Sequence, residues 1–149
     1  MHLKNANPDT ERSQENKMPR TTNKINHIGL YVNDLERMRL FYEKYFNAKA
    51  SEMYHNPKTS LRTYFLEFEG SCRIEIMTRE NLNNIAKELN DVGYIHIAFS
   101  IGSKNRVDEL TELLENDGYK IISKPRTTGD GYYESCIFDP EGNQVEIVE

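Results

Sequence analysis

The sequence predicts an α+β domain made of two βαβββ modules in tandem. Two observations predict this fold class. Segments with strand-like alternation surround one amphipathic helix in each half of the chain, in the same order. Chemically matched residues also recur at similar offsets: His27 and His96 are 69 residues apart, and Glu75 and Glu146 are 71 apart. An internal repeat of this kind predicts two copies of one structural unit.

In the first half, residues 24–32 alternate between apolar and polar side chains and are predicted to form a strand. Asp34 is a good N-cap, and apolar residues at helical spacing predict a helix that ends near Asn47. Three further strands are predicted over 48–54, 61–69 and 72–78. The last two are joined by a tight turn, and a polar loop over 79–92 follows.

The second half repeats this order. Residues 93–101 alternate and predict a strand, after which Ser103 begins a helix that Gly118 stops. The helix is followed by three predicted strands over 119–123, 131–138 and 143–148. The modules therefore span about 24–78 and 93–149.

Length and composition limit the number of domains, the kinds of partner and the expected location of the protein. The chain has 149 residues, the size of one ordinary domain, and residues 1–23 are polar and aperiodic, so we expect a disordered tail before a domain over 24–149. A net charge of −5 argues against a nucleic-acid partner. No apolar run is long enough to span a membrane, and without an apolar stretch near residue 1 we expect no secretory signal. With two cysteines, the expected location is the cytoplasm.

The strand pattern places one histidine and one glutamate on the same kind of face in each half. Because strand side chains alternate, His27 and His96 are expected on the face opposite to the apolar face of their strands. The same alternation puts Glu75 and Glu146 on the corresponding faces of their own strands, and Arg73 shares the face of Glu75. Two imidazoles and two carboxylates suit a divalent metal, since the carboxylates neutralise its charge and coordination positions stay open for substrate oxygens. The sequence therefore predicts a metal site built from both halves.

Four segments carry a resemblance to a known family: INHIGLYVNDLERMRLFYEKYF, RIEIM, YIHIAFSI and GYYESCIFDPEGNQVEIVE. Over about residues 24–149 the chain resembles the vicinal oxygen chelate superfamily, which has the glyoxalase, bleomycin-resistance and extradiol-dioxygenase fold. The resemblance implies that the paired modules form a cupped mixed sheet around a metal, with the helices on its outer face.

The glyoxalase I (lactoylglutathione lyase) branch of that superfamily has metal ligands in the order His, Glu, His, Glu. These positions correspond to His27, Glu75, His96 and Glu146 in this sequence. The resemblance implies that Glu146 is also the proton-shuttling base of a lyase or isomerase that acts on a hemithioacetal-type carbonyl compound through a metal-bound enediolate. It further implies Ni²⁺ or Zn²⁺ as the cofactor, and a homodimer in which each site spans two subunits.

The expected substrate contacts differ from those of that branch. Glutathione-using bacterial enzymes carry Arg four residues after the first His and Asn four residues after the first Glu, where this chain has Tyr31 and Arg79. These two residues, with Tyr133 after a glycine-rich stretch, are the substrate-binding candidates. The alternatives are a metal-free, ligand-sequestering protein of the bleomycin-resistance kind, or another enzyme of the superfamily such as an epimerase or thiol transferase. The complete ligand set favours the lyase.

Overall fold

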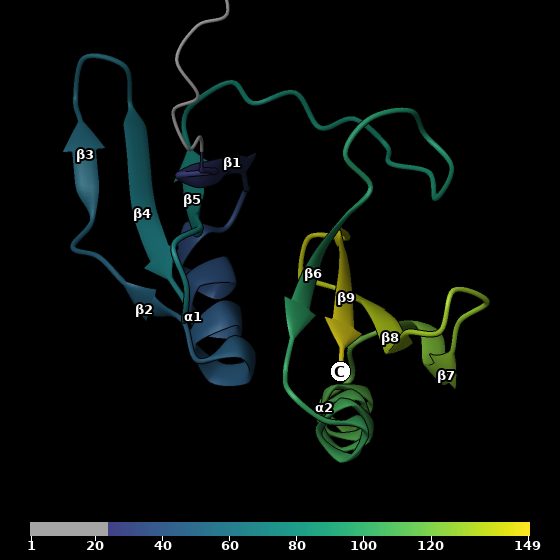
Figure 1. Cartoon of the computed structure of the whole chain (residues 1–149). Coiled ribbons are helices and arrows are strands. Elements are labelled where there is room, and N and C mark those ends of the chain that lie inside the picture. The colour runs from purple at the N-terminus through teal and green to yellow at the C-terminus, as the bar shows by residue number, and fades with distance from the viewer. Residues whose placement is uncertain (1–23) are drawn as a thin grey trace, which may run out of the picture.

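The computed structural model describes residues 24–149, and the predicted tail over 1–23 lies outside them. The described chain is α+β and consists of two βαβββ-like modules, each with one helix and its own mixed sheet. Figure 1 shows the two sheets in separate halves of the molecule, joined by a long connection over residues 79–95. The predicted fold class is confirmed. Within one chain, however, the two sheets stay separate.

All strands of the first module belong to one sheet. Its elements are β1 (His27–Tyr31), α1 (Leu35–Phe46), β2 (Lys49–Ala50), β3 (Tyr54–Asn56), β4 (Leu61–Glu67) and β5 (Arg73–Thr78). The strand order is β1-β5-β4-β2, and β3 also pairs with β4. β1 runs parallel to β5, whereas the other pairs are antiparallel. β1 therefore forms an edge of its sheet.

The second module repeats this arrangement. Its elements are β6 (His96–Ser100), α2 (Lys104–Asn116), β7 (Ile121–Thr127), β8 (Tyr133–Phe138) and β9 (Gln144–Val148). The strand order is β6-β9-β8-β7, with β6 parallel to β9 and the other pairs antiparallel. β6 thus occupies the edge position that β1 occupies in the first module. Neither helix of the described chain is long and apolar enough to cross a membrane.

Both helices begin at the predicted residues. The Asp34 carboxylate accepts a hydrogen bond from the Arg37 N–H at 2.9 Å, and the Ser103 hydroxyl accepts one from the Arg106 N–H at 3.4 Å. These bonds satisfy N–H groups that have no partner within the helix. α1 ends at Phe46 and is capped by Asn47, which has a left-handed conformation with φ of 54°.

Two strand predictions differ from the structure. The strand expected over 48–54 is divided into β2 and β3, because at Ser51 the side-chain hydroxyl, in place of a backbone carbonyl, accepts the hydrogen bond from the Phe65 N–H at 3.0 Å. The strand expected over 119–123 starts later and runs through Pro125 as β7. Proline donates no hydrogen bond, but β7 is an edge strand with register shifts, where this residue is tolerated.

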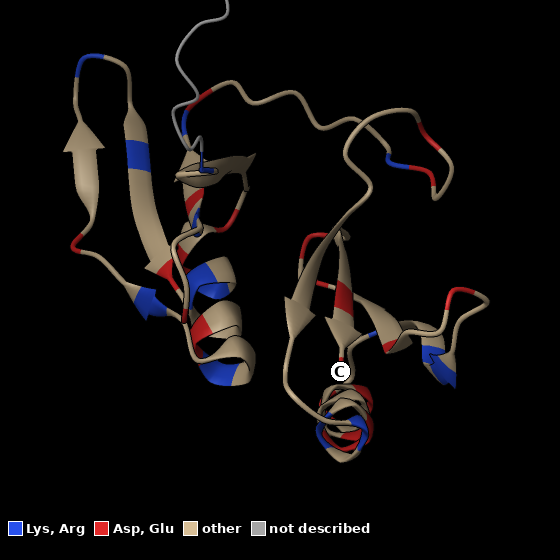
Figure 2. Cartoon of the chain, viewed as in Figure 1, with Lys and Arg blue, Asp and Glu red and all other residues tan. Residues whose placement is uncertain are grey.

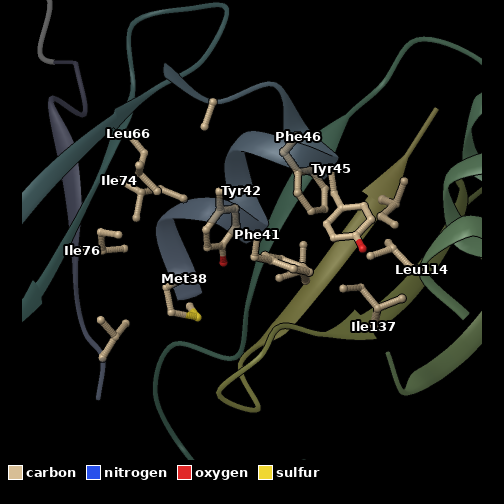
Figure 3. Packing of buried hydrophobic residues seen from close by; sticks show 14 of the residues in the cluster. Met38, Phe41, Tyr42, Tyr45, Phe46, Leu66, Ile74, Ile76, Leu114 and Ile137 are labelled. Atoms are coloured by element: carbon tan, nitrogen blue, oxygen red, sulfur yellow. The ribbon is translucent and has the colours of Figure 1, made fainter. Parts of the chain in front are cut away.

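The hydrophobic core is continuous across the two modules. Figure 3 shows the aromatic side chains of α1 between Leu66, Ile74 and Ile76 on one side and Leu114 and Ile137 on the other. Ring contacts cross between the modules: Phe46 and Phe99 have centroids 4.4 Å apart, and Phe41 and Tyr119 have centroids 5.0 Å apart. α1 therefore packs against its own sheet and against the second module.

The turn between β8 and β9 docks onto the start of α1. The Glu141 carboxylate accepts hydrogen bonds from the backbone N–H groups of Asn33 at 2.8 Å and Asp34 at 2.7 Å. The buried Asp139 carboxylate accepts one from the Tyr42 hydroxyl at 3.3 Å. This turn fixes the second module to the first through polar contacts beside the shared core.

Candidate metal centre

The first half of the candidate centre lies on β1 and β5. The two strands are parallel, with Gly29 opposite Glu75, so alternation puts His27 and Glu75 on the same face. His27 Nε2 lies 3.6 Å from Glu75 Oε2. The imidazole is 41% exposed and the carboxylate 19% exposed. This face is opposite to the one that packs Ile74 and Ile76 into the core.

Neighbouring side chains brace this pair. Asn26 Oδ1 accepts a hydrogen bond from His27 Nδ1 at 2.8 Å, which favours the tautomer whose Nε2 lone pair faces Glu75. The Thr63 hydroxyl lies 3.2 Å from Glu75 Oε1 and 3.0 Å from the Ile76 carbonyl oxygen, and its one proton is shared between them. The imidazole and the carboxylate are therefore both held by residues outside the pair.

The second half lies on β6 and β9, where the register repeats and Ala98 is opposite Glu146. His96 Nδ1 is 3.2 Å from Glu146 Oε1, and both side chains are partly exposed. Burial raises the pKa of Glu146, the charge of His96 opposes this shift, and the nearby Glu134 adds to it. Figure 2 shows an acidic position in red on β5 and another on β9. Each module therefore presents one His–Glu pair.

Cys136 adds a thiol to the second half. It is the cross-strand partner of Glu146 in the β8–β9 pair, so both side chains lie on the same face of the sheet. Cys136 is buried, and burial raises its pKa to about 11, with the charge of Glu146 adding to the shift. The group is therefore a neutral thiol at neutral pH.

The two pairs are not joined within one chain. The structure brings His27 to Glu75 and His96 to Glu146, but in residues 24–149 no three His, Cys, Asp or Glu side chains gather as a group that could hold a metal. Each pair lies at an edge of its own sheet, because β1 and β6 are edge strands. One chain thus carries two half-centres, and convergence of all four residues remains a prediction about an assembly.

The three substrate-binding candidates lie in two places. Tyr31, at the end of β1, and Arg79, just after β5, both line a hollow of about 800 Å³ together with part of the 81–87 segment. Tyr133 lies on the face of β8 that packs toward α2, where its hydroxyl donates to Asp108 at 2.7 Å. The geometry therefore gives no support to a contact between Tyr133 and a ligand at the His96–Glu146 pair of the same chain.

The residues present fit a divalent metal ion. Two ligands bound to one ion at 2.0–2.2 Å stand about 3.0–3.5 Å apart in tetrahedral or octahedral geometry. The separations of 3.6 Å in the first pair and 3.2 Å in the second are close to this range. Each pair also supplies one carboxylate, so two pairs together would bring two negative charges to a dication.

Three residues near the pairs were not identified from the sequence: Asn26, Thr63 and Cys136. Asn26 immediately precedes the histidine of the first pair, which was an available signal. Thr63 and Cys136 come from β4 and β8, and their positions follow from cross-strand register. Register cannot be read from a single strand, so these two residues required the paired sheet.

The fold and the two half-centres define a paired-module protein with a candidate divalent-metal site. The model of the Glyoxalase/Bleomycin resistance protein/Dioxygenase superfamily matches residues 24–147, and the chain belongs to this superfamily. The resemblance found in the sequence is therefore confirmed.

Two curated relatives come from Bacillus subtilis (strain 168). The uncharacterized protein YqjT is 29% identical over 127 residues, covering 83% of this chain and 97% of the relative. A probable trivalent organoarsenical cleaving enzyme is 30% identical over 129 residues, covering 81% and 76% respectively. Among solved structures, a V278E mutant of glyoxalase I from Zea mays matches with a TM-score of 0.68 and 22% identity over 84% of this chain. The chain spans 44% of the maize protein, and this likeness shows the fold alone.

Proposed function

We propose that this protein is a metal-dependent, glyoxalase I-like lyase of the lactoylglutathione lyase type. It would isomerise a hemithioacetal-type carbonyl substrate through an enediolate. The observation that carries the proposal is the His–Glu pair at the same register in both sheets, 3.6 Å and 3.2 Å across. A protein that only sequesters a ligand needs no such repeated donor set.

Each complete site is proposed to form between two copies of the chain, in a homodimer. His27 and Glu75 of one copy would join His96 and Glu146 of the other. Support comes from β1 and β6, which end their sheets without a further strand in the described chain. Large apolar side chains that precede these strands in the sequence are exposed as well: Ile25 before β1, and Val92 and Tyr94 before β6. Unpaired edges and exposed apolar side chains are features that a partner subunit covers.

The proposed chemistry divides the work among the four residues. A divalent ion such as Ni²⁺ or Zn²⁺, when bound, stabilises negative charge that develops on substrate oxygens. His27, Glu75 and His96 hold their positions as ligands. Glu146 takes the proton from the carbon beside the carbonyl group and returns it to the neighbouring carbon. Its pKa, raised by burial, makes it a stronger base than an ordinary carboxylate.

The direct test is an assay of protein stripped of metal and then supplied with Ni²⁺ or Zn²⁺. The substrates are hemithioacetals formed from methylglyoxal and several thiols, glutathione included. Turnover should follow metal loading, stop with chelator and return when the ion is restored. If the protein binds no stoichiometric metal after supplementation and turns over none of these compounds, the lyase proposal fails and a metal-free binding protein is favoured.

A complementation experiment tests the two-copy site. His27→Ala inactivates the first half-centre and His96→Ala the second, so each homodimer should lack activity. In a mixed dimer one of the two sites joins two intact halves. Equal amounts of both variants, unfolded and refolded together, should recover about one quarter of wild-type turnover and bound metal, since about half of the dimers are mixed. Absence of any recovery, with dimers present by light scattering, would contradict a site shared between chains.

A second candidate function is cleavage of a trivalent organoarsenical. Two observations favour it: the 30% identical relative whose description names this activity, and the Cys136 thiol on the same face as Glu146. Sulfur is a soft ligand suited to a soft element such as trivalent arsenic. Incubation of the metal-loaded protein with a trivalent organoarsenical, followed by detection of released inorganic arsenic, tests it. Arsenic release without any hemithioacetal turnover would favour this function over the lyase.

A further inference from the structure

Arg73 lies on the same face of the first sheet as the His27–Glu75 pair. It is the first residue of β5 and comes two residues before Glu75, so the two side chains share a face. Its cross-strand partner on β1 is His27. Arg73 is distinct from Arg79, which lines the hollow beyond the end of β5.

The guanidinium group of Arg73 is held in place by two uncharged groups. It stacks over the Phe65 ring with 4.5 Å between the guanidinium carbon and the ring centroid. One terminal nitrogen donates to Asn26 Oδ1 at 2.9 Å, the same oxygen that accepts the hydrogen bond from His27 Nδ1. A single acceptor therefore links the arginine to the histidine of the candidate centre.

Arg73 has no carboxylate at salt-bridge distance among residues 24–149, although Glu67 is its cross-strand partner on β4. Arg39 shows the contrast, because it bonds to Glu36 at 2.9 Å and to Glu43 at 2.6 Å. Arg73 is partly buried and already ordered, so its remaining N–H groups can bind an anion at a small further cost in side-chain entropy.

We propose that Arg73 binds an anionic group, a carboxylate in the first instance, of the ligand that occupies the candidate centre. The inference rests on the proposed function because it assigns a specificity-determining residue to the same site, at a position different from the family's usual thiol-binding residues. The planar fork of the guanidinium matches a carboxylate through two parallel hydrogen bonds. The site would select against cationic analogues of the same shape.

The test uses three matched ligands with adjacent oxygens: 3,4-dihydroxybenzoate is anionic, catechol is neutral and dopamine is cationic. Their affinities are measured by titration calorimetry on the wild-type protein, both metal-loaded and metal-free. The anionic ligand should bind at least about 10-fold more tightly than the cationic one, the scale of one charge-assisted hydrogen-bonded contact. Raising the salt concentration should reduce this ratio.

Substitutions at Arg73 test whether the preference for the anionic ligand depends on this side chain. Arg73→Gln should bring the ratio of affinities close to one, whereas Arg73→Lys, which keeps the charge without the fork, should retain part of it. Arg62→Gln is the matched control, since Arg62 lies on β4 with its side chain on the opposite face, at the register of Thr78, and it should leave the ratio unchanged. If Arg73→Gln proves unstable in a thermal melt, the Lys variant carries the test, with the ratio again the measured quantity.

The outcomes separate this inference from the proposed function. An Arg73-dependent preference in metal-free protein, without turnover of any hemithioacetal, supports the anion site while the lyase proposal fails. Turnover at equal efficiency with anionic, neutral and cationic thiols, unchanged in Arg73→Gln, overturns the anion site while the lyase proposal stands. Equal binding of the three ligands, no binding at all, or a preference that survives Arg73→Gln also overturns it.

Discussion

The two half-centres hold the same pair of side chains in different surroundings. In the first module, Asn26 fixes the His27 imidazole and Thr63 contacts the Glu75 carboxylate. In the second module, the contact between His96 and Glu146 has no such bracing hydrogen bond among the described residues. One half is therefore built to hold its groups still, and the other leaves its carboxylate able to move.

This difference assigns roles to the two glutamates within the proposed function. A base must approach the substrate carbon and then release its proton, so freedom from bracing is an advantage for Glu146. A ligand benefits from neighbours that orient it, as Thr63 does for Glu75. Burial also raises the pKa of Glu146, which makes this carboxylate a stronger base.

The largest effect on turnover should come from replacing the carboxylate of Glu146 by an amide, in comparison with the same replacement at Glu75. Glu146→Gln keeps the size and a ligand oxygen but removes the base, so turnover should fall by at least about 100-fold while the fold and some metal remain. Glu75→Gln should lower turnover by about 10-fold or less, since it removes one ligand's charge. Glu112→Gln, an exposed position on α2, serves as the control. Steady-state kinetics of metal-loaded protein measure all three. Near-normal turnover of the Glu146→Gln protein would remove Glu146 as the base.

A smaller effect should follow when the brace itself is removed. Thr63→Val keeps the shape but loses the hydroxyl near Glu75, and it should weaken metal binding by about 10-fold. Cys136→Ala changes the corresponding face of the second module, where the thiol makes no hydrogen bond to Glu146, and the affinity should stay within about 3-fold of wild type. Competition with a metal-binding dye gives both values. Equal losses in the two variants would contradict the asymmetry between the halves.

The smallest effect should come from Tyr42→Phe, which lies away from both pairs. The variant loses the hydrogen bond to the buried Asp139 carboxylate, and the free energy of unfolding should fall by about 1 kcal/mol at pH 7. Metal affinity at both half-centres should be unchanged. Chemical denaturation, with metal binding measured in parallel, tests this separation of stability from site chemistry.

The loss of stability in Tyr42→Phe should depend on pH, and the pKa of Asp139 gives the sign of this dependence. Burial raises the pKa of Asp139, and the hydrogen bond from Tyr42 opposes that shift. The contribution of Asp139 to stability is therefore greatest below the ordinary Asp range near pH 4 and declines as pH rises through the folded pKa. Without the hydroxyl the pKa rises further, so the loss in Tyr42→Phe should be larger at pH 7 than at pH 3.5. A larger loss at pH 3.5 would contradict this account.

Much of the fold was predictable because it depends on local patterns. Helix starts at Asp34 and Ser103 follow from capping chemistry, and the repeated alternation locates the strands that carry the pairs. The pairing of His27 with Glu75, and of His96 with Glu146, agrees with the predicted faces. The division of the 48–54 strand was not predictable, because it depends on a hydrogen bond between Ser51 and the distant Phe65.

The remaining features of the candidate site depend on register and on the relation between modules. Thr63 and Cys136 reach the two pairs from neighbouring strands, and a sequence read one strand at a time does not show which residues stand opposite. The orientation of Tyr133 toward α2 has the same origin. The two sheets stay apart within one chain because α1 packs between them, and no local sequence pattern specifies this packing.

The aromatic junction around α1 and the turn at Asp139 and Glu141 set the angle between the two sheets of a chain. In a dimer of the proposed kind, every site takes one half from each chain, so this angle determines the spacing of ligands in both sites at once. A substitution at Phe99, on the face of β6 opposite to His96, would then alter both reaction centres equally through the packing of the modules. Inherited variation at the junction would change the geometry of the whole dimer, while variation on a His–Glu face would change the chemistry alone.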